Sequence, residues 1–326
     1  MTFDVICLRP EADFLRIGVT PPKTLQIAYR APGEADLAPL IREARALVMP
    51  AVGPKVPPSL FEKGAIKLIQ VTGAGVDRLD EPAMKRLGIP VANVPGGSNE
   101  AVAEYVLAAA SMLLRRLAWS GEEVRAGRYK EFRAAMMAAN LSGLHGLSVG
   151  IVGMGTIGLA VAKALRVHEC EILYHDPSPR DAKAASQLGA TSVTLDELLA
   201  RSEVVTIHVP LVPATQGMIG ASQLAKMKEG AILINAARGG IVDEAALADA
   251  LRSGYLGGAA VDVYAIEPPE NSNPLLSLEG EAAHRLLLTP HIAGVTRQAY
   301  ALLFRSAWDN VERVLVQGLA PLNRVY

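Results

Sequence analysis

Three segments of the chain carry, just after an apolar run, charged or titratable side chains that could take part in acid–base chemistry. They are INAARGGIVDE, AAVDVYAIEPPE and LLLTPHIAG, and each contains an apolar run typical of a buried strand. Arg238, Asp262 with Glu267, and His291 follow these runs, at the edge where open α/β sheets bind ligands. An imidazole titrates near neutral pH, and a guanidinium presents a fixed fork of donors to a carboxylate. Considered singly, each is more often an ordinary loop or surface residue.

A glycine-rich segment upstream predicts a phosphate-binding turn. VGIVGMGTIG places Gly153, Gly155 and Gly158 in G-x-G-x-x-G spacing, after an apolar strand and before the helical AVAKALR. The first glycine permits a tight turn, the second lets the backbone approach a pyrophosphate, and the third lets the helix pack closely on the strand. Thr156 and Ile157 begin that helix, whose N-terminus faces the anion. This context favours dinucleotide binding over glycines that serve only as turn formers.

Asp176 ends the next predicted strand, CEILYHD. It lies about 20 residues beyond the glycine loop, where an acidic group accepts hydrogen bonds from the adenosine ribose. A carboxylate there repels the additional phosphate of NADP, so the sequence predicts NAD, with NADP less favoured. Arg180, beyond Pro-Ser-Pro, would soften this preference. Methyltransferases also combine a glycine loop with an acidic residue, and this motif leaves them open.

Two alternating series of strands and helices must position these residues. Apolar runs predict strands over residues 4–8, 24–30, 46–50, 66–72 and 89–94, and again over 147–154, 170–176, 204–210, 231–237, 257–264 and 285–291. Helical patterns occupy residues 35–45 and 80–86, a long stretch over 99–117, and 296–317 near the C-terminus. Strands that alternate with helices in this way predict an α/β fold built on parallel sheets.

Length and composition narrow the class of protein further. A chain of 326 residues predicts two domains, and a net charge of -1 provides no field that would attract nucleic acid. We expect no membrane partner, because the apolar run 105–114 is too short to cross a bilayer. Two widely spaced cysteines predict neither disulfides nor a zinc site, and favour a cytoplasmic location. No His, Asp and Glu set has the spacing of metal ligands, so no metal is expected.

Several motifs, in this order, resemble the D-isomer-specific 2-hydroxyacid dehydrogenases. The resemblance covers nearly the whole chain, from VTGAGVDRLD through NVPGGSNEAVAEYVLA, the glycine loop, IHVPLVPATQGMIG, NAARGGIVDE and DVYAIEPP to TPHIAG. It implies two Rossmann-like domains, in which a parallel-sheet NAD-binding domain, residues 99–292, is inserted into a flavodoxin-like substrate domain, residues 1–98 and 293–326. It also implies an NAD-dependent oxidoreductase that interconverts a D-2-hydroxy acid and its 2-oxo acid by hydride transfer. Glyoxylate, hydroxypyruvate or another small 2-oxo acid would be the substrate.

The resemblance implies a catalytic role for three residues. His291 would donate a proton during reduction and accept one during oxidation, and Glu267 would hold the imidazole and stabilise its protonated form. Arg238 would bind the substrate carboxylate and polarise the carbonyl group. The backbone amides of Ala74 and Gly75 resemble the family's second cradle for that carboxylate. Substrate binding is therefore expected at Ala74, Gly75, Arg238 and His291.

The same resemblance extends the predicted cofactor site. Asp262 and the carbonyl of Ala236 resemble the family's nicotinamide contacts, and the segment 208–210 with Thr215 resembles its ribose and pyrophosphate edge. The complete predicted set of cofactor contacts is Gly153, Gly155, Thr156, Ile157, Gly158, Asp176, His208, Val209, Pro210, Thr215, Ala236, Ala237, Arg238, Asp262, His291 and Gly294.

Departures from particular relatives limit the substrate. Formate dehydrogenases carry glutamine where this chain has Glu267, and phosphite dehydrogenases add a lysine to the turn that here reads TGAG. Phosphoglycerate-using members tend to carry arginine after the strand 46–50, whereas this chain has Met49 and Pro50 and no cation before Lys55. The chain also ends at Tyr326, without room for the regulatory domain of longer phosphoglycerate enzymes. We therefore expect that formate, phosphite and phosphoglycerate are not substrates.

Two further expectations concern assembly and an alternative function. Residues 99–117 and 119–129 resemble the family's dimer-forming region, so a homodimer is expected. Some relatives are non-catalytic NAD(H) sensors or corepressors on the same fold. That alternative predicts NADH binding without turnover, and the presence of Arg238, Glu267 and His291 argues against it.

Overall fold

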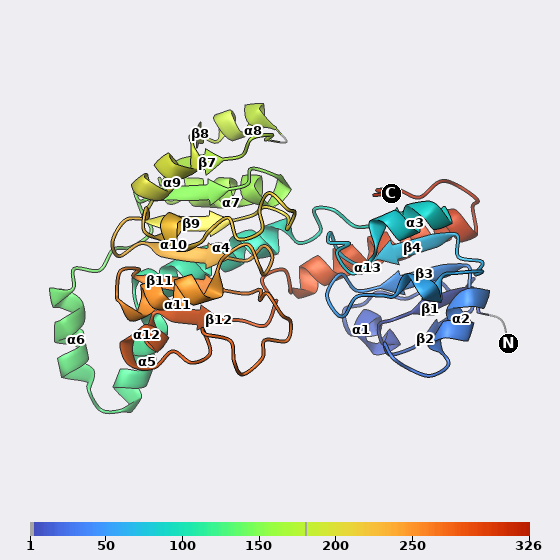
Figure 1. The fold of residues 1–326 in the computed structure, drawn as a ribbon, viewed down its shortest axis with the longest axis horizontal. Coiled ribbons are helices and arrows are strands. Elements are labelled where there is room, and N and C mark those ends of the chain that lie inside the picture. Colours follow the sequence, from blue (N-terminus) through green and yellow to red (C-terminus); the bar gives the residue numbers. More distant parts are fainter. Residues whose placement is uncertain (1–2, 180) are drawn as a thin grey trace. The chain divides into compact units, whose positions relative to one another are not determined.

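The computed structural model describes residues 3–179 and 181–326 and divides the chain into two compact units (Figure 1). Unit 1 comprises Met1–Ser98 and Val295–Tyr326, and unit 2 comprises Asn99–Gly294, so unit 2 is an insertion in the chain of unit 1. Arg180, which bears on the choice between NAD and NADP, lies outside the described residues. Among the residues described, no helix is both long enough and apolar enough to cross a membrane.

Unit 1 is built on a parallel sheet. Its strands are β1 (Val5–Cys7), β2 (Ile27–Tyr29), β3 (Ala46–Met49), β4 (Leu68–Val71) and β5 (Val91–Ala92). Its helices are α1 (Glu11–Arg16), α2 (Leu37–Glu43), α3 (Glu81–Leu87) and α13 (Arg297–Leu315), with a 3-10 helix at Pro58–Leu60. Within the described part of the chain the strand order is β2-β1-β3-β4-β5. This is the flavodoxin-like order, and it agrees with the expected architecture.

Helices cover both faces of the sheet of unit 1, because its strands are buried on both sides. One face packs against α2 and α3, and the other against α1 and α13 (Figure 1). Successive residues of β3 alternate between the two cores: Leu47 and Met49 belong to the first, Ala46 and Val48 to the second. Helix α13 comes from the C-terminal end of the chain, so residues 295–326 complete this unit.

Unit 2 contains a larger parallel sheet. Its strands are β6 (Ser148–Val152), β7 (Glu171–His175), β8 (Thr191–Ser192), β9 (Val204–Ile207), β10 (Ile232–Asn235), β11 (Gly258–Val261) and β12 (Leu286–Leu288). In the described residues the order is β12-β11-β10-β9-β6-β7-β8. Counted from β6 and read from the β8 edge, this is the 3-2-1-4-5-6 order of dinucleotide-binding folds with one further strand. The predicted α/β class with parallel sheets is confirmed.

Nine helices are described in unit 2. They are α4 (Asn99–Leu114), α5 (Leu117–Arg125), α6 (Tyr129–Ala138), α7 (Thr156–Arg166), α8 (Ala182–Gln187), α9 (Leu195–Arg201), α10 (Ala221–Leu224), α11 (Glu244–Arg252) and α12 (Gly280–His284). The core on one face joins the sheet to α4 and α7, and the core on the other joins it to α9, α10 and α11. Ile234 of β10 faces the first core and its neighbour Leu233 faces the second.

The predicted helix over residues 99–117 is wrong at its C-terminal end. Helix α4 stops at Leu114, and Arg116 adopts a left-handed conformation with φ 49° before α5 begins. The break turns α5 so that Trp119 stacks on the imidazole of His284, with ring centroids 4.7 Å apart. This contact with α12 is formed by residues far apart in the sequence, so the local pattern could not reveal it.

Candidate active site

The proposed catalytic residues of unit 2 lie at one edge of its sheet. Strands β10, β11 and β12 are neighbours and run parallel, so the loops that follow them share the carboxyl edge. Arg238 lies three positions after the end of β10, Glu267 follows β11, and His291 follows β12. The structure therefore brings together three residues that are spread over 54 positions of the sequence, from 238 to 291.

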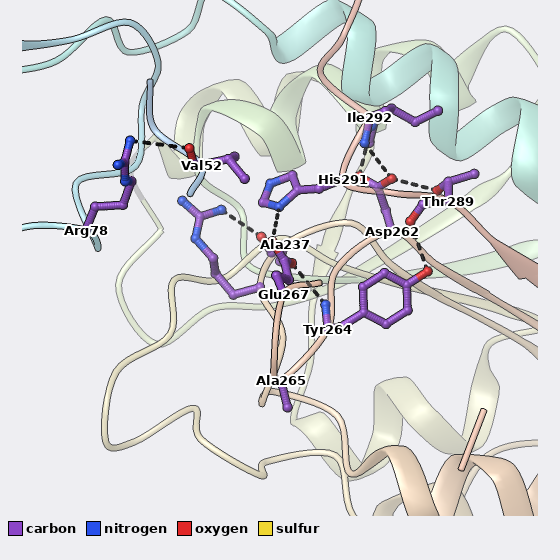
Figure 2. A network of polar contacts seen from close by, with 12 residues as sticks. Val52, Arg78, Ala237, Asp262, Tyr264, Ala265, Glu267, Thr289, His291 and Ile292 are labelled. Atoms are coloured by element: carbon purple, nitrogen blue, oxygen red, sulfur yellow. Dashed lines mark hydrogen bonds and ion pairs between the residues drawn. The ribbon is translucent and has the colours of Figure 1, made fainter. Parts of the chain in front are cut away.

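His291 and Glu267 form a close pair (Figure 2). The His291 Nδ1 atom is 2.9 Å from Glu267 Oε2, and the other carboxylate oxygen accepts the backbone N–H of Tyr264 at 3.0 Å. Burial raises the pKa of Glu267, but these hydrogen bonds and the charges of His291 and Arg238 outweigh it, so the pKa lies below its usual range. An ionised carboxylate only accepts hydrogen bonds, so Nδ1 donates and Nε2 remains for proton exchange.

Asp262 holds the backbone of the His291 loop. Its side chain is 1% exposed, and Oδ1 accepts bonds from Thr289 Oγ1 at 2.6 Å and from Ile292 N–H at 2.7 Å. Oδ2 accepts the N–H of Ala293 at 2.9 Å, and the Asp262 carbonyl accepts the N–H of His291 at 2.7 Å. Figure 2 shows the Asp262 side chain with its bonds to Thr289 and Ile292. Oδ2 keeps one acceptor position, which fits the nicotinamide contact that the family resemblance implies.

His291 itself has a left-handed backbone, with φ 56°. For a residue with a Cβ atom this conformation costs about 1–2 kcal/mol and persists only where the surroundings impose it. The bonds to Asp262 on both sides of the residue supply that restraint. Two sets of contacts therefore orient the imidazole: Asp262 holds the backbone around His291, and Glu267 binds the ring at Nδ1.

The loop that carries Arg238 is held by Asn235 and packed against the Glu267 loop. Asn235 is 3% exposed; its side chain accepts the N–H of Ala237 at 3.2 Å and donates to the Arg238 carbonyl at 3.1 Å. Arg238 Nη1 donates to the Ala237 carbonyl at 2.7 Å. A Cβ atom at Gly239 would lie 1.8 Å from the carbonyl oxygen of Tyr264. Glycine is therefore required where the loops after β10 and β11 touch.

The glycine loop has the geometry of a dinucleotide turn. Gly153 has φ 97°, and a Cβ atom there would lie 2.7 Å from the carbonyl oxygen of His208. At Gly158 a Cβ atom would lie 2.1 Å from the Gly153 carbonyl oxygen, so its absence lets α7 approach β6. At Gly155 a Cβ atom would meet no protein atom within 4 Å. Packing therefore explains the first and third glycines, and an open approach to the N-terminus of α7 suits a pyrophosphate at the second.

Two further residues near this loop fit a nucleotide. Asp176 is half-buried, and its carboxylate oxygens accept the N–H groups of Met154 and Ser178, each at 2.8 Å. Each oxygen retains acceptor capacity for a ribose hydroxyl. His208 Nε2 is 2.9 Å from Thr206 Oγ1, whereas Nδ1 is buried without a described partner. Burial lowers the pKa of His208 to about 3, so its imidazole is neutral at physiological pH.

The remaining predicted cofactor contacts lie on the same carboxyl edge of unit 2. Val209 and Pro210 follow β9, and the hydroxyl of Thr215 closes their loop by donating to the Pro210 carbonyl at 2.6 Å. Ala236 follows β10, and Gly294 ends the unit. Thr156 and Ile157 form the first turn of α7. Their contacts with a cofactor stay predictions.

Ala74 and Gly75 belong to unit 1, in the turn after β4. Ala74 is exposed, and among the described residues neither amide of the pair donates to a protein acceptor. Two hydrogen bonds from the segment after β5 fix the turn. The Asn93 side chain donates to the Ala74 carbonyl at 2.6 Å, and Val94 N–H donates to the Gly73 carbonyl at 2.9 Å. Two N–H groups without a described protein acceptor, on a fixed turn, can bind a carboxylate.

Sequence reasoning missed the residues that support the site. They are Asn235, Gly239, Tyr264 and Thr289, together with Tyr105 of α4, whose hydroxyl lies 2.7 Å from Thr289 Oγ1. Polar residues that end apolar strand runs are the pattern that could have indicated Asn235 and Thr289. Nothing in the local sequence distinguishes Tyr105 from a core residue. Within the described residues, no group of three or more His, Cys, Asp or Glu side chains is arranged to hold a metal.

The fold is that of an NAD-binding dehydrogenase, and one inserted α/β unit carries both the dinucleotide turn and the predicted acid–base pair. Comparison with known families gives the same answer, since residues 107–293 match the D-isomer specific 2-hydroxyacid dehydrogenase, NAD binding domain. The chain belongs to the D-isomer specific 2-hydroxyacid dehydrogenase family. The predicted family, enzyme class and cofactor are confirmed, and the methyltransferase alternative is excluded.

Individual relatives agree with this assignment. The glycerate dehydrogenase of Methylorubrum extorquens is 38% identical over 76% of this chain and 75% of that protein. The crystal structure of the TT0316 protein from Thermus thermophilus has a TM-score of 0.80 and 32% identity, with 99% of both chains covered. A D-3-phosphoglycerate dehydrogenase of Archaeoglobus fulgidus is 41% identical over 72% of this chain, which spans only 42% of that protein.

Proposed function

We propose that this protein reduces a small 2-oxo acid to its D-2-hydroxy acid with NADH, and catalyses the reverse oxidation with NAD. The observation that carries this proposal is the 2.9 Å contact between His291 and Glu267, at the sheet edge that also presents Arg238. The substrates that we propose are hydroxypyruvate and glyoxylate. A glycerate dehydrogenase among the relatives favours the first of them.

The proposed roles follow from charge and proton availability. When bound, NADH would supply the hydride for reduction, and NAD would accept it in the reverse oxidation. His291 donates a proton from Nε2 to the carbonyl oxygen during reduction and removes it during oxidation. Glu267 stabilises the imidazolium, and Arg238 binds the substrate carboxylate through its forked donors. The amides of Ala74 and Gly75, in the turn after β4 of unit 1, stay a predicted carboxylate cradle, as the family resemblance implies.

The test is NADH consumption, followed by absorbance, with glyoxylate, hydroxypyruvate, pyruvate and phenylpyruvate, and with NADPH in parallel. Phosphohydroxypyruvate is added to the panel because several relatives are phosphoglycerate dehydrogenases. Turnover of hydroxypyruvate or glyoxylate supports the proposal. Preferred turnover of phosphohydroxypyruvate would correct the substrate, and NADH binding without any turnover would favour the sensor or corepressor alternative.

Glu267→Gln should change the pH dependence of the reaction. Glutamine keeps a hydrogen-bonding oxygen toward Nδ1 but removes the negative charge that stabilises the imidazolium. Reduction needs the protonated ring, so the pH above which reduction slows should move down by about one pH unit. Initial rates of reduction across the pH range measure this shift. Glu270→Gln, a nearby exposed carboxylate, serves as the control; an identical profile in both variants would remove Glu267 from its role.

Asp176→Asn should weaken the preference for NADH. The carboxylate repels the additional phosphate of NADPH, so its neutralisation should reduce the NADH-to-NADPH ratio of kcat/KM by about 10- to 100-fold. Asp181→Asn is the matched control, since Asp181 caps α8 outside the glycine loop. Because Asp176 accepts two backbone amides, the melting temperature is measured as well. An unchanged coenzyme ratio in a folded variant would contradict the assignment.

We also propose that the protein is a homodimer, formed through α5, which overlaps the predicted segment 119–129, and through the adjoining α6. Figure 1 shows α6 standing away from the sheet of its own unit. Val124, Tyr129 and Met137 are 51%, 58% and 67% exposed there, which is unusual for three large apolar side chains so close together. Light scattering at micromolar concentration should give twice the monomer mass. Met137→Glu should shift the mass toward the monomer, and a monomeric wild-type protein would contradict the proposal.

A cytoplasmic location is part of the same proposal. Both cysteines, Cys7 and Cys170, are free, and Cys7 is buried in the core of unit 1. Free thiols suit a reducing compartment.

A further inference from the structure

We propose that Tyr105 and Thr289 are positioning residues, which act through the carboxylate of Asp262 to hold His291 in its reactive orientation. Tyr105 lies on α4, and Thr289 lies between β12 and His291. The catalytic consequence rests on the proposed function, whereas the contacts themselves lie entirely within unit 2. Neither residue touches the reacting atoms in this scheme.

The direction of the hydrogen bonds defines a chain. Thr289 Oγ1 lies 2.6 Å from Asp262 Oδ1 and 2.7 Å from the Tyr105 hydroxyl. A threonine hydroxyl has one proton, and an ionised carboxylate can only accept, so Thr289 donates to Asp262. The Tyr105 hydroxyl must then donate to Thr289. Each donor in such a chain polarises the next and strengthens its bond.

Tyr105 is suited to remain the donor at the start of this chain. Burial among the residues between α4 and the sheet, reinforced by the negative charge of Asp262, raises the pKa of Tyr105 to about 12. The hydroxyl therefore stays protonated throughout the working pH range. Tyr264 supports the same segment from another direction, because its hydroxyl donates to the Thr289 carbonyl at 3.0 Å.

Asp262 connects the hydrogen-bond chain from Tyr105 and Thr289 to the loop that carries His291. Its two oxygens accept the N–H groups of Ile292 and Ala293, directly after the left-handed His291. If Asp262 rotated, both amides would lose their acceptor, and the backbone of His291 would relax toward a conformation that suits an L-residue better. A side chain on a helix of the unit's core thus controls the geometry of the proton donor.

Tyr105→Phe removes only the first hydroxyl of the chain. We expect kcat to fall about fivefold, the effect of one hydrogen bond. Thr289→Val removes a donor to a charged group, so its kcat should fall at least about tenfold, and Thr289→Ser should restore most of the activity. In the free protein, hydrogen exchange of the Ile292 and Ala293 amides should become about fivefold faster in Tyr105→Phe.

Tyr255→Phe is the matched control, because the Tyr255 hydroxyl donates to the carbonyls of Ala225 and Met227, away from this loop. It should leave both kcat and the two amide exchange rates unchanged. Unchanged exchange of Ile292 and Ala293 in Tyr105→Phe and Thr289→Val would overturn the inference. Exchange needs no substrate, so absence of turnover in the wild type would remove the proposed function while the exchange rates still decide whether Tyr105 positions the loop.

Discussion

His291→Ala is expected to lower kcat for reduction of the 2-oxo acid by about 10²- to 10⁴-fold, the usual contribution of a positioned proton donor. Binding of NADH, followed by its fluorescence, should survive, because the glycine loop and Asp176 lie on other strands. The variant also changes the backbone preference at a left-handed position. His291→Asn is therefore the more informative variant, since asparagine adopts this conformation readily but is no acid.

His145→Ala provides the control for this experiment. His145 is an exposed histidine of unit 2 whose imidazole lies 3.9 Å from Glu169, and it should tolerate the change. Retention of kcat within about threefold in both His291 variants, an effect far below that of a proton donor, would show that another group supplies the proton.

Arg238→Ala is expected to lower kcat/KM for the 2-oxo acid by about 10²- to 10³-fold, as loss of a desolvated charge partner typically does. Both KM and kcat should change, because the guanidinium binds the carboxylate and polarises the carbonyl. Arg238→Lys keeps the charge but loses the planar fork, so it should recover only part of the activity. Binding of oxamate, a non-reacting analogue, to the NADH-loaded protein separates the two contributions.

Arg252→Ala is the appropriate comparison for Arg238. Arg252 lies on α11 of the same unit, exposed and paired with Asp249, and its loss should change neither parameter. If Arg238→Ala bound oxamate as tightly as the wild type did, the carboxylate would have to be held elsewhere.

Most strands were predictable because burial on both faces leaves continuous apolar runs in the sequence. Strand β8 was not, since it consists of Thr191 and Ser192, both exposed, and has no apolar residue to mark it. The end of α4 was missed for a different reason. Its sequence continues to favour a helix through Leu117, and a tertiary contact between Trp119 and His284 accompanies the break.

The candidate site also has a part that the local sequence predicts and a part that only tertiary contacts determine. Because the ends of parallel strands share an edge, Arg238, Glu267 and His291 could be named from their places after apolar runs. The pairing of Glu267 with Nδ1 depends on the order of β11 and β12 in the sheet, which no local pattern encodes. The structure also gives Asp262 a task beyond the implied nicotinamide contact. Its oxygens hold the His291 loop, and only the bonds to Thr289, Ile292 and Ala293 reveal this.

The contact of Gly239 with the Tyr264 carbonyl has a consequence for protein engineering. With no space for even a methyl group, the loop after β10 and the loop after β11 form a matched pair of surfaces. If a chimera takes one of these loops from a relative whose loop follows a different backbone path, that loop would clash with the unchanged loop or lose contact with it. Libraries aimed at new substrates should therefore exchange residues 236–240 and 262–267 together, or leave both as they are and vary the turns of unit 1.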